Sequence, residues 1–173
     1  MKKVLFVASE GVPFIKTGGL ADVVGSLPKY LNKEEFDVRV ILPKYLCMRE
    51  DMKNRLNYVT HFYMDLGWRS QYVGVLETVY DGIQFYFVDN EYYFAGPKPY
   101  GNIYEDIEKF AFFSKAAISL LPSVGFKPDI IHCHDWQTGL VPVFLKAFCY
   151  ADEFYNHAKT VITIHNLKFQ GIW

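Results

Sequence analysis

The sequence predicts an α/β fold in which helices flank a mainly parallel β-sheet and an antiparallel hairpin is attached to that sheet. Four short runs with a core of apolar residues, at residues 4–9, 38–42, 129–134 and 160–165, are typical of parallel strands in a buried sheet. Segments with a helical spacing of apolar residues separate these runs, which favours right-handed β-α-β crossovers. A further stretch, residues 58–88, is rich in aromatic side chains and contains a hairpin signal.

The first β-α-β unit begins with the strand at residues 4–9, after which Gly18 and Gly19 open a helix. Apolar residues recur along this helix at the spacing of one buried stripe, namely Leu20, Val23, Val24, Leu27 and Leu31. Pro28 falls inside this pattern, so we expect a kink or a break there. The strand at residues 38–42 completes the unit.

The aromatic-rich stretch is expected to add three strands, at residues 58–64, 72–80 and 83–88. Asp81 and Gly82 lie between the last two and are a typical two-residue hairpin turn. We therefore expect an antiparallel insertion or edge on the parallel sheet. The many Tyr and Phe side chains fit strand and core packing, whereas exposed rings would provide a surface on which sugars stack.

The second half of the chain continues the alternation of helices and strands. A loop at residues 96–101 precedes a helix at residues 107–121, whose apolar face comprises Phe110, Phe113, Ala117, Ile118 and Leu121. The strand at residues 129–134 is followed by a crossover helix at residues 139–148 and by the last strand. No helix follows that strand, although a parallel sheet needs both faces covered. Either a partner covers that face, or the sequence is a fragment of a longer protein, and we expect the uncovered strand to favour self-association.

Composition excludes several classes of function. The formal net charge of −1 gives no general electrostatic attraction for nucleic acid, and no apolar run is long enough to span a membrane. The three cysteines are far apart and form no C-x-x-C pair, which argues against a disulfide framework and against a thiolate zinc site. We expect a cytoplasmic protein that binds neither nucleic acid nor membranes.

A glycine loop, defined here as Lys16, Thr17, Gly18 and Gly19, follows the first strand. Open α/β sheets bind ligands at the carboxyl ends of their strands. Glycines let a ligand approach the backbone, and a helix N-terminus with a nearby lysine favours an anion. The alternative is a tight strand-to-helix turn with a solvated lysine.

Histidines follow two other strands. His132, His134 and Asp135 end the third of the four apolar runs, and His165 ends the fourth. Because alternate residues of a strand point to one face, His132 and His134 lie on the same face, and with Asp135 and His165 they could supply metal ligands for a hydrolase. The alternative is one buried, hydrogen-bonded histidine beside another that lines a polar cleft, with Asp135 as a helix N-cap.

His165 is followed directly by an amide side chain, Asn166. An imidazole next to an amide offers hydrogen-bonding groups that suit a polyhydroxyl ligand. The alternative for Asn166 is a side chain that stabilises a local turn.

Three motifs resemble those of bacterial glycogen synthases and plant starch synthases. Residues 16–20 resemble the K-x-G-G-L signature of these enzymes. Residues 132–136 match their H-x-H-D-W segment, and residues 163–171 match their T-x-H-N-L-x-[FY]-Q-G segment. The resemblance covers essentially the whole chain, and three motifs in the family's order are highly specific.

The resemblance implies a two-domain GT-B fold, of which residues 1–173 would be part of the N-terminal Rossmann-like domain. It also implies transfer of glucose from ADP-glucose to the non-reducing end of an α-1,4-glucan, with retention of configuration and without a metal or another cofactor. The C-terminal nucleotide-binding domain is absent from the sequence. It would be a necessary partner, so we expect the fragment alone to be inactive.

The resemblance also assigns roles on the donor side of the site. Lys16 and the backbone of Gly18 and Gly19 would contact the diphosphate or the developing leaving group. N–H groups at a helix N-terminus stabilise negative charge that grows in the transition state.

The remaining roles concern the two sugars. His165 would contact the transferred glucose as a catalytic residue, and Asp135 and Asn166 would support the same pocket. Tyr93 would lie near the acceptor sugar. Two other functions stay open at this level: the metal-dependent hydrolase that uses the histidines, and a non-enzymatic carbohydrate-binding module that uses exposed aromatic rings.

Overall fold

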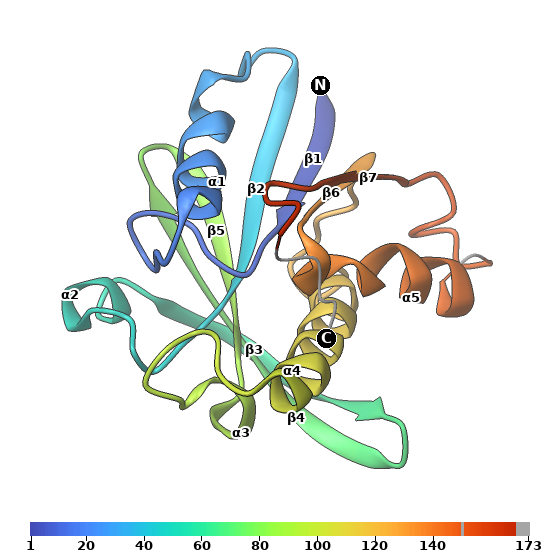
Figure 1. Ribbon diagram of the computed structural model, residues 1–173. Helices are drawn as coiled ribbons and strands as arrows, with labels where there is room; N and C mark the ends of the chain where they lie inside the picture. Colours follow the sequence, from blue (N-terminus) through green and yellow to red (C-terminus); the bar gives the residue numbers. More distant parts are fainter. Residues whose placement is uncertain (150, 169–173) are drawn as a thin grey trace.

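The computed structural model describes residues 1–149 and 151–168. Within these residues, seven strands form one sheet in the order β3-β4-β5-β2-β1-β6-β7 (Figure 1). The strands are β1 (Lys2–Val7), β2 (Phe36–Pro43), β3 (Asn57–Leu66), β4 (Arg69–Tyr80), β5 (Ile83–Asp89), β6 (Ile130–His134) and β7 (Lys159–Thr163). The helices are α1 (Gly19–Tyr30), α2 (Glu50–Lys53), α3 (Glu91–Phe94), α4 (Ile103–Ser119), η1 (Trp136–Thr138) and α5 (Leu140–Phe148). The predicted α/β class is confirmed.

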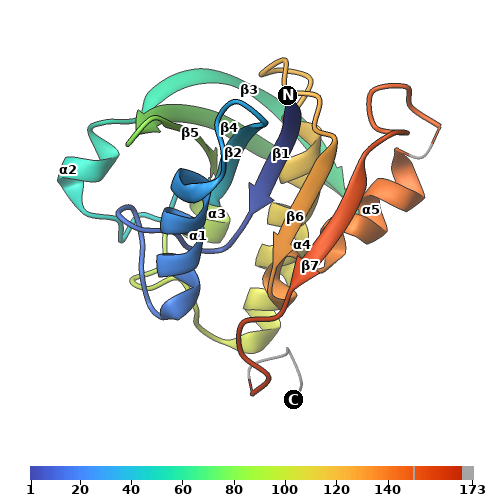
Figure 2. The same cartoon turned by 90° about the horizontal axis from the view of Figure 1, so that it is seen from above.

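The central strands of the sheet are parallel, and the strand order changes direction at β1. That strand pairs in parallel with β2 on one side and with β6 on the other. The chain therefore adds strands first to one side of β1 and later to the other. Right-handed crossovers then place α1 and α5 on opposite faces of the sheet, as Figure 2 shows.

The aromatic-rich stretch forms the edge of the sheet. Asp81 and Gly82 have φ angles of 50° and 74°, which is the geometry of a type I′ hairpin turn, so the predicted hairpin is confirmed. β5 pairs in parallel with β2, while β3 and β4 are antiparallel. Of the two predicted arrangements, an insertion or an edge, the structure has the edge.

Two details of α1 differ from the sequence-based expectation. Of the expected kink or break at Pro28, the break is wrong, because the helix includes Pro28 and ends two residues later; the kink stays a prediction. Val23 and Leu27 are 36% and 37% exposed, although both were predicted to lie in the buried stripe. The buried face is turned toward Gly25 instead, because this glycine lies directly against the backbone of Val12.

Other boundaries shift for local reasons. α4 begins at Ile103, four residues before the predicted start, because the Asn102 side chain caps it by accepting the Tyr104 N–H at 3.0 Å. The short helices α2 and α3 were not predicted, since four residues are too few to show a helical period. β7 ends at Thr163, which leaves His165 in the segment that follows.

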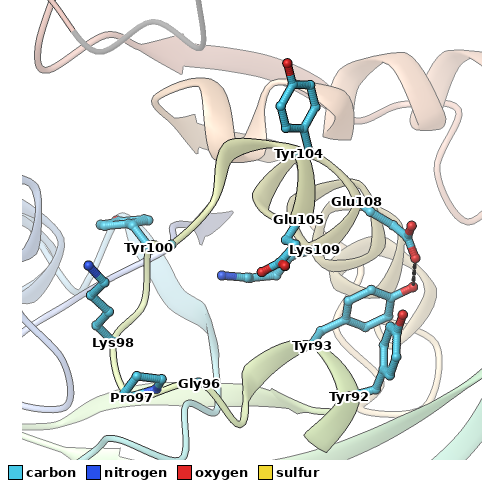
Figure 3. Close-up of a pocket in the computed structure, with 11 residues that line it drawn as sticks. Tyr92, Tyr93, Gly96, Pro97, Lys98, Tyr100, Tyr104, Glu105, Glu108 and Lys109 are labelled. Carbon is cyan, nitrogen blue, oxygen red and sulfur yellow. Dashed lines mark hydrogen bonds between the residues drawn. The ribbon is translucent and has the colours of Figure 1, made fainter. Parts of the chain in front are cut away.

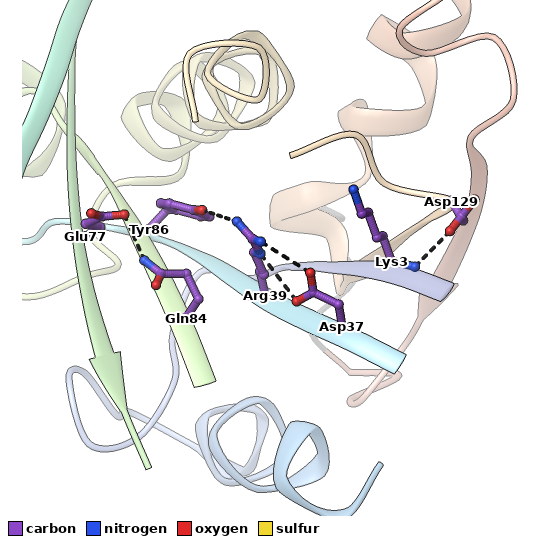
Figure 4. A network of polar contacts seen from close by, with 7 residues as sticks. All are labelled: Lys3, Asp37, Arg39, Glu77, Gln84, Tyr86 and Asp129. Carbon is purple, nitrogen blue, oxygen red and sulfur yellow. Dashed lines mark hydrogen bonds and ion pairs between the residues drawn. The ribbon is translucent and has the colours of Figure 1, made fainter. Parts of the chain in front are cut away.

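The amino ends of the strands, opposite the predicted site, carry polar groups that satisfy one another (Figure 4). Arg39 of β2 donates to Tyr86 of β5 at 2.6 Å and forms an ion pair with Asp37. Asp129 accepts the backbone N–H of Lys3 at 2.8 Å and so ties the start of β6 to β1. These contacts tie together strands β1, β2, β5 and β6 at this end of the sheet.

The described chain leaves β7 largely exposed. Val161 and Ile162 are 48% and 49% exposed, so an apolar strand lacks the cover that buried parallel strands normally have. Self-association through this strand stays a prediction. Among the described residues, no helix is both long and apolar enough to cross a membrane, and all three cysteines are unpaired.

Gly25 provides a test of the packing between α1 and the first loop. A Cβ atom at this position would lie 2.4 Å from the Val12 carbonyl oxygen, so we expect Gly25→Ala to lower the free energy of unfolding by roughly 1–3 kcal/mol. Gly19→Ala is the matched control on the same helix, because its Cβ would meet nothing within 4 Å. Urea unfolding of both variants checks this, and equal midpoints would contradict the packing.

Candidate functional site

Most of the predicted site residues follow the carboxyl ends of β1, β6 and β7, which are neighbours in the sheet, whereas Tyr93 lies in α3 after β5. The glycine loop follows β1, η1 follows β6, and His165 follows β7. Because β1 is the strand at which the sheet reverses its order, this is the topological switch point, where open α/β sheets bind ligands. The sequence-based prediction of one shared edge is therefore matched by the strand order.

The glycine loop is held by the buried carboxylate of Glu10, which is 3% exposed. Its oxygens accept the Thr17 N–H, the Thr17 hydroxyl at 2.9 Å and the Gly18 N–H at 3.3 Å. A fourth donor is the hydroxyl of Tyr100, at 3.0 Å. One buried carboxylate thus fixes the loop from beneath. Glu10 was not predicted as a site residue; the signal for it was a charged residue directly after a buried strand.

Tyr100 connects this anchor to a more distant part of the chain. Burial and the nearby Glu10 carboxylate raise the pKa of Tyr100 well above its usual value, so its hydroxyl keeps its proton and donates a hydrogen bond to Glu10. The Ser9 hydroxyl, 2.7 Å away, then donates to the Tyr100 oxygen. Three hydroxyl and carboxylate groups from two segments therefore form one satisfied network.

Neither the packing nor the backbone conformation of the described residues requires glycine at Gly18 or Gly19. A Cβ atom at Gly18 or Gly19 would meet nothing within 4 Å. The φ angle of Gly18 is −151°, which any residue adopts, and no side chain caps α1. The backbone at the start of α1 is thus open to close approach from outside.

Lys16 lies on the exposed side of the loop. Its Nζ is 2.7 Å and 2.8 Å from the two carboxylate oxygens of Asp22, in the first turn of α1. Both side chains are about half exposed, at 52% and 55%, and exposed pairs of this kind contribute little to stability. An anionic ligand can therefore replace Asp22 as the partner of Lys16 at a small cost in free energy.

Three histidines form a column at the carboxyl ends of β6 and β7. The rings of His132 and His134 stack with centroids 4.2 Å apart, and those of His134 and His165 stack at 5.2 Å. His132 Nε2 is 2.7 Å from the Thr163 hydroxyl, and His134 Nδ1 is 2.9 Å from His165 Nε2. Burial lowers the pKa of His132, and burial with two neighbouring histidines lowers that of His134 to about 3. Both are therefore neutral.

Asp135 holds the backbone of His165 in place. Its Oδ1 accepts the His165 N–H at 2.6 Å, and its own N–H donates to the Thr163 carbonyl at 2.9 Å. Its φ and ψ of 59° and −177° are in a region normally reserved for glycine, a conformation that costs about 1–3 kcal/mol. Asp135 stands at the N-cap position of η1, as the alternative predicted, but its side chain makes no capping hydrogen bond there.

The histidine column does not have the geometry of a metal site. Among the described residues, no three His, Cys, Asp or Glu side chains are placed to hold a metal ion. The ring nitrogens of His132 and His134 that have partners are bound to Thr163 and His165. The rings are stacked face to face instead of converging on one point, so the geometry offers no support for the hydrolase.

A cavity of about 640 Å³ lies next to the anchor of the glycine loop (Figure 3). Tyr100 forms part of its wall, and Lys98, Glu105 and Lys109 supply charged groups. The cavity therefore combines aromatic and charged groups, and through Tyr100 it shares a hydrogen-bond network with Glu10.

Tyr93 lines this cavity, but it is only 8% exposed. Its ring stacks on Phe112, and its hydroxyl donates to Glu108 at 2.7 Å. The neighbouring Tyr92 is 73% exposed and also lines the cavity. The predicted contact of Tyr93 with the acceptor sugar stays a prediction, and Tyr92 presents the more accessible ring.

Asn166 is exposed, and its side chain hydrogen-bonds to the backbone two residues further along the chain. Its Oδ1 accepts the Lys168 N–H at 2.9 Å, which is the turn-stabilising alternative considered for this residue. The end of the third motif, residues 169–171, lies outside the described residues.

Comparison with known proteins gives consistent matches. The family model of the starch synthase catalytic domain matches residues 3–173. A glycogen synthase of Lachnoclostridium phytofermentans is 69% identical over the whole chain, and one of Lachnospira eligens is 65% identical; the chain covers 36% of each protein. It therefore spans about a third of the length of these curated relatives.

A solved structure agrees in fold as well as in sequence. It is the catalytic domain of starch synthase IV from Arabidopsis thaliana bound to ADP and acarbose. The match has a TM-score of 0.87 and 34% identity, and covers 98% of this chain and 35% of that one. These matches support neither a metal-dependent hydrolase nor a non-enzymatic carbohydrate-binding module.

The strand order, the open glycine loop and these matches lead to one conclusion: the chain belongs to the starch synthase catalytic domain family.

Proposed function

We propose that this chain forms one wall of the catalytic cleft of a retaining glucosyltransferase, which transfers glucose from ADP-glucose to the non-reducing end of an α-1,4-glucan. The observation that carries the proposal is the glycine loop. Two glycines that neither packing nor φ requires stand at a helix N-terminus, on a loop that a buried carboxylate fixes. A ligand that approaches the backbone closely explains them.

The chemistry of the loop suits a departing nucleoside diphosphate. As the glycosidic bond to the donor breaks, negative charge grows on the leaving phosphate. The open N–H groups of α1 and the ammonium of Lys16 are donors that favour this charge. Because Glu10 holds the loop before any ligand arrives, the donors need little reorganisation when the charge develops.

The two buried carboxylates of the site are unsuited to proton transfer. Glu10 accepts N–H and hydroxyl groups of the loop and Tyr100, and Asp135 accepts the His165 N–H. A pair of free carboxylates, as glycoside hydrolases use, is not formed by these residues. We therefore propose that the leaving phosphate itself receives the proton of the acceptor hydroxyl.

The cavity beside Tyr100 is the proposed place of the acceptor glucan. Exposed rings of Tyr92 and Tyr104 flank it, at 73% and 77% exposure, and sugars stack on such rings. The Arabidopsis relative was solved with ADP and with acarbose, which supports a cleft that takes both a nucleotide and an oligosaccharide. We propose that no metal or other cofactor takes part and that the protein acts in the cytoplasm.

The remainder of a complete synthase would provide the opposite wall of the cleft. The chain covers 36% of its curated relatives, so we propose a C-terminal domain as its necessary partner and expect no turnover by these residues alone. A chimaera supplies that partner: residues 1–173 replace the matching third of the Lachnoclostridium phytofermentans glycogen synthase, to which they are 69% identical.

One kinetic prediction concerns the glycine loop. In the chimaera, Gly18→Ala should lower kcat/KM for ADP-glucose roughly a hundredfold, because a methyl group displaces the phosphate by about 1 Å. Tyr30→Ala is the control on the same helix, since this ring is 85% exposed. Steady-state kinetics checks this. Equal losses of kcat/KM in both variants, or no loss in Gly18→Ala, would show that the glycine loop is not part of the donor site.

Another kinetic prediction concerns His165. Its replacement by alanine in the chimaera should lower kcat about 10²- to 10³-fold, as loss of one preorganised donor does. His157, which is exposed and lies before β7, provides the control, and His157→Ala should keep full activity. Wild-type turnover in His165→Ala would exclude a catalytic role for this imidazole.

A further inference from the structure

His134 is buried in the middle of the histidine column and has no assigned role in the proposed reaction. It is 0% exposed. Its ring lies between those of His132 and His165, and the ring of Phe6 packs against it at 5.0 Å. Its Nδ1 is 2.9 Å from Nε2 of His165, while its Nε2 has no hydrogen-bond partner among the described residues.

These contacts determine where the single proton of His134 resides. Burial lowers the pKa of His134 to about 3, so the ring is neutral and carries one N–H. If the proton were on Nε2, a buried N–H would lack an acceptor, which is rarer and more costly than an unpaired acceptor. With the proton on Nδ1, the N–H has a partner, and only a lone pair is left unsatisfied on Nε2.

We propose that His134 is a positioning residue: its Nδ1–H donates to Nε2 of His165 and holds His165 in the tautomer that carries its proton on Nδ1. The backbone supports the same arrangement, since Asp135 Oδ1 binds the His165 N–H at 2.6 Å. The ring of His165 is thus held by a hydrogen bond at Nε2 and by stacking, and its backbone by Asp135.

The tautomer decides what His165 offers to a substrate. Nε2 is occupied by His134, and Nδ1 bears a proton, so the free ring nitrogen is a hydrogen-bond donor. It can bind an oxygen lone pair, such as that of a sugar hydroxyl or a phosphate, but it cannot remove a proton. This consequence rests on the proposed function, whereas the tautomer itself does not.

The direct test is the ¹⁵N spectrum of the histidine rings in the 173-residue chain, recorded at about pH 8, where exposed imidazoles are neutral. We expect His165 to show a protonated Nδ1 and an unprotonated Nε2, with a coupling across the hydrogen bond to His134 Nδ1. A protonated Nε2 on His165 would overturn the proposal. The spectrum is recorded on the unmodified chain, so the result does not depend on whether a variant folds.

Two variants test the same point through function. In the chimaera, His134→Leu removes the donor, whereas His134→Asn keeps an N–H₂ group near the position of Nδ1. We expect His134→Leu to lower kcat roughly 10- to 100-fold, about the loss caused by removing a residue that orients a metal-binding histidine, with KM little changed. His134→Asn should regain much of this loss. Equal rates in the two variants would contradict a donor role.

The two proposals fail separately. If His165→Ala abolishes turnover but the spectrum shows a protonated Nε2, the glucosyltransferase site stands and the role of His134 is wrong. If the spectrum shows the expected tautomer but His165→Ala turns over normally, His134 still sets the tautomer, and the proposed function of His165 is wrong.

Discussion

The site depends on one buried interaction, the set of hydrogen bonds that the Glu10 carboxylate accepts. Thr17, Gly18 and Tyr100 all donate to it. A buried carboxylate is costly unless donors surround it, so the loop, the start of α1 and the wall of the cavity must keep their relative positions. The open backbone at Gly18 and Gly19 is rigid for the same reason, which is what recognition of a developing anion requires.

The strand order also brings His165, which neighbouring residues hold in place, to the same edge of the sheet. Because β6 pairs with β1 and β7 pairs with β6, the turn after β6 and the segment with His165 follow strands that adjoin β1, the strand that leads into the glycine loop. Asp135 and His134 each bind His165, one through its backbone and one through its ring. The unusual backbone of Asp135 is a local cost that these contacts offset, as is common where geometry serves function.

Sequence patterns could predict the class of fold and the edge that carries the site, because buried strands and their polar ends have a simple signal. They could not predict Glu10, whose role needs the long-range contact with Tyr100. They also placed Val23 and Leu27 in the core, since periodicity does not show which side of a helix a close backbone contact at Gly25 selects. The tautomer of His165 likewise depends on stacked rings that only the fold brings together.

The most direct test is a crystal structure of the chimaera with bound ADP. The account predicts that a phosphate oxygen lies within hydrogen-bond distance of the backbone N–H groups at the start of α1, with Lys16 released from Asp22 and Glu10 still bound to Thr17. A diphosphate bound elsewhere, with Lys16 still paired to Asp22 as in the free chain, would contradict the claim that the glycine loop is a preformed site for the leaving group.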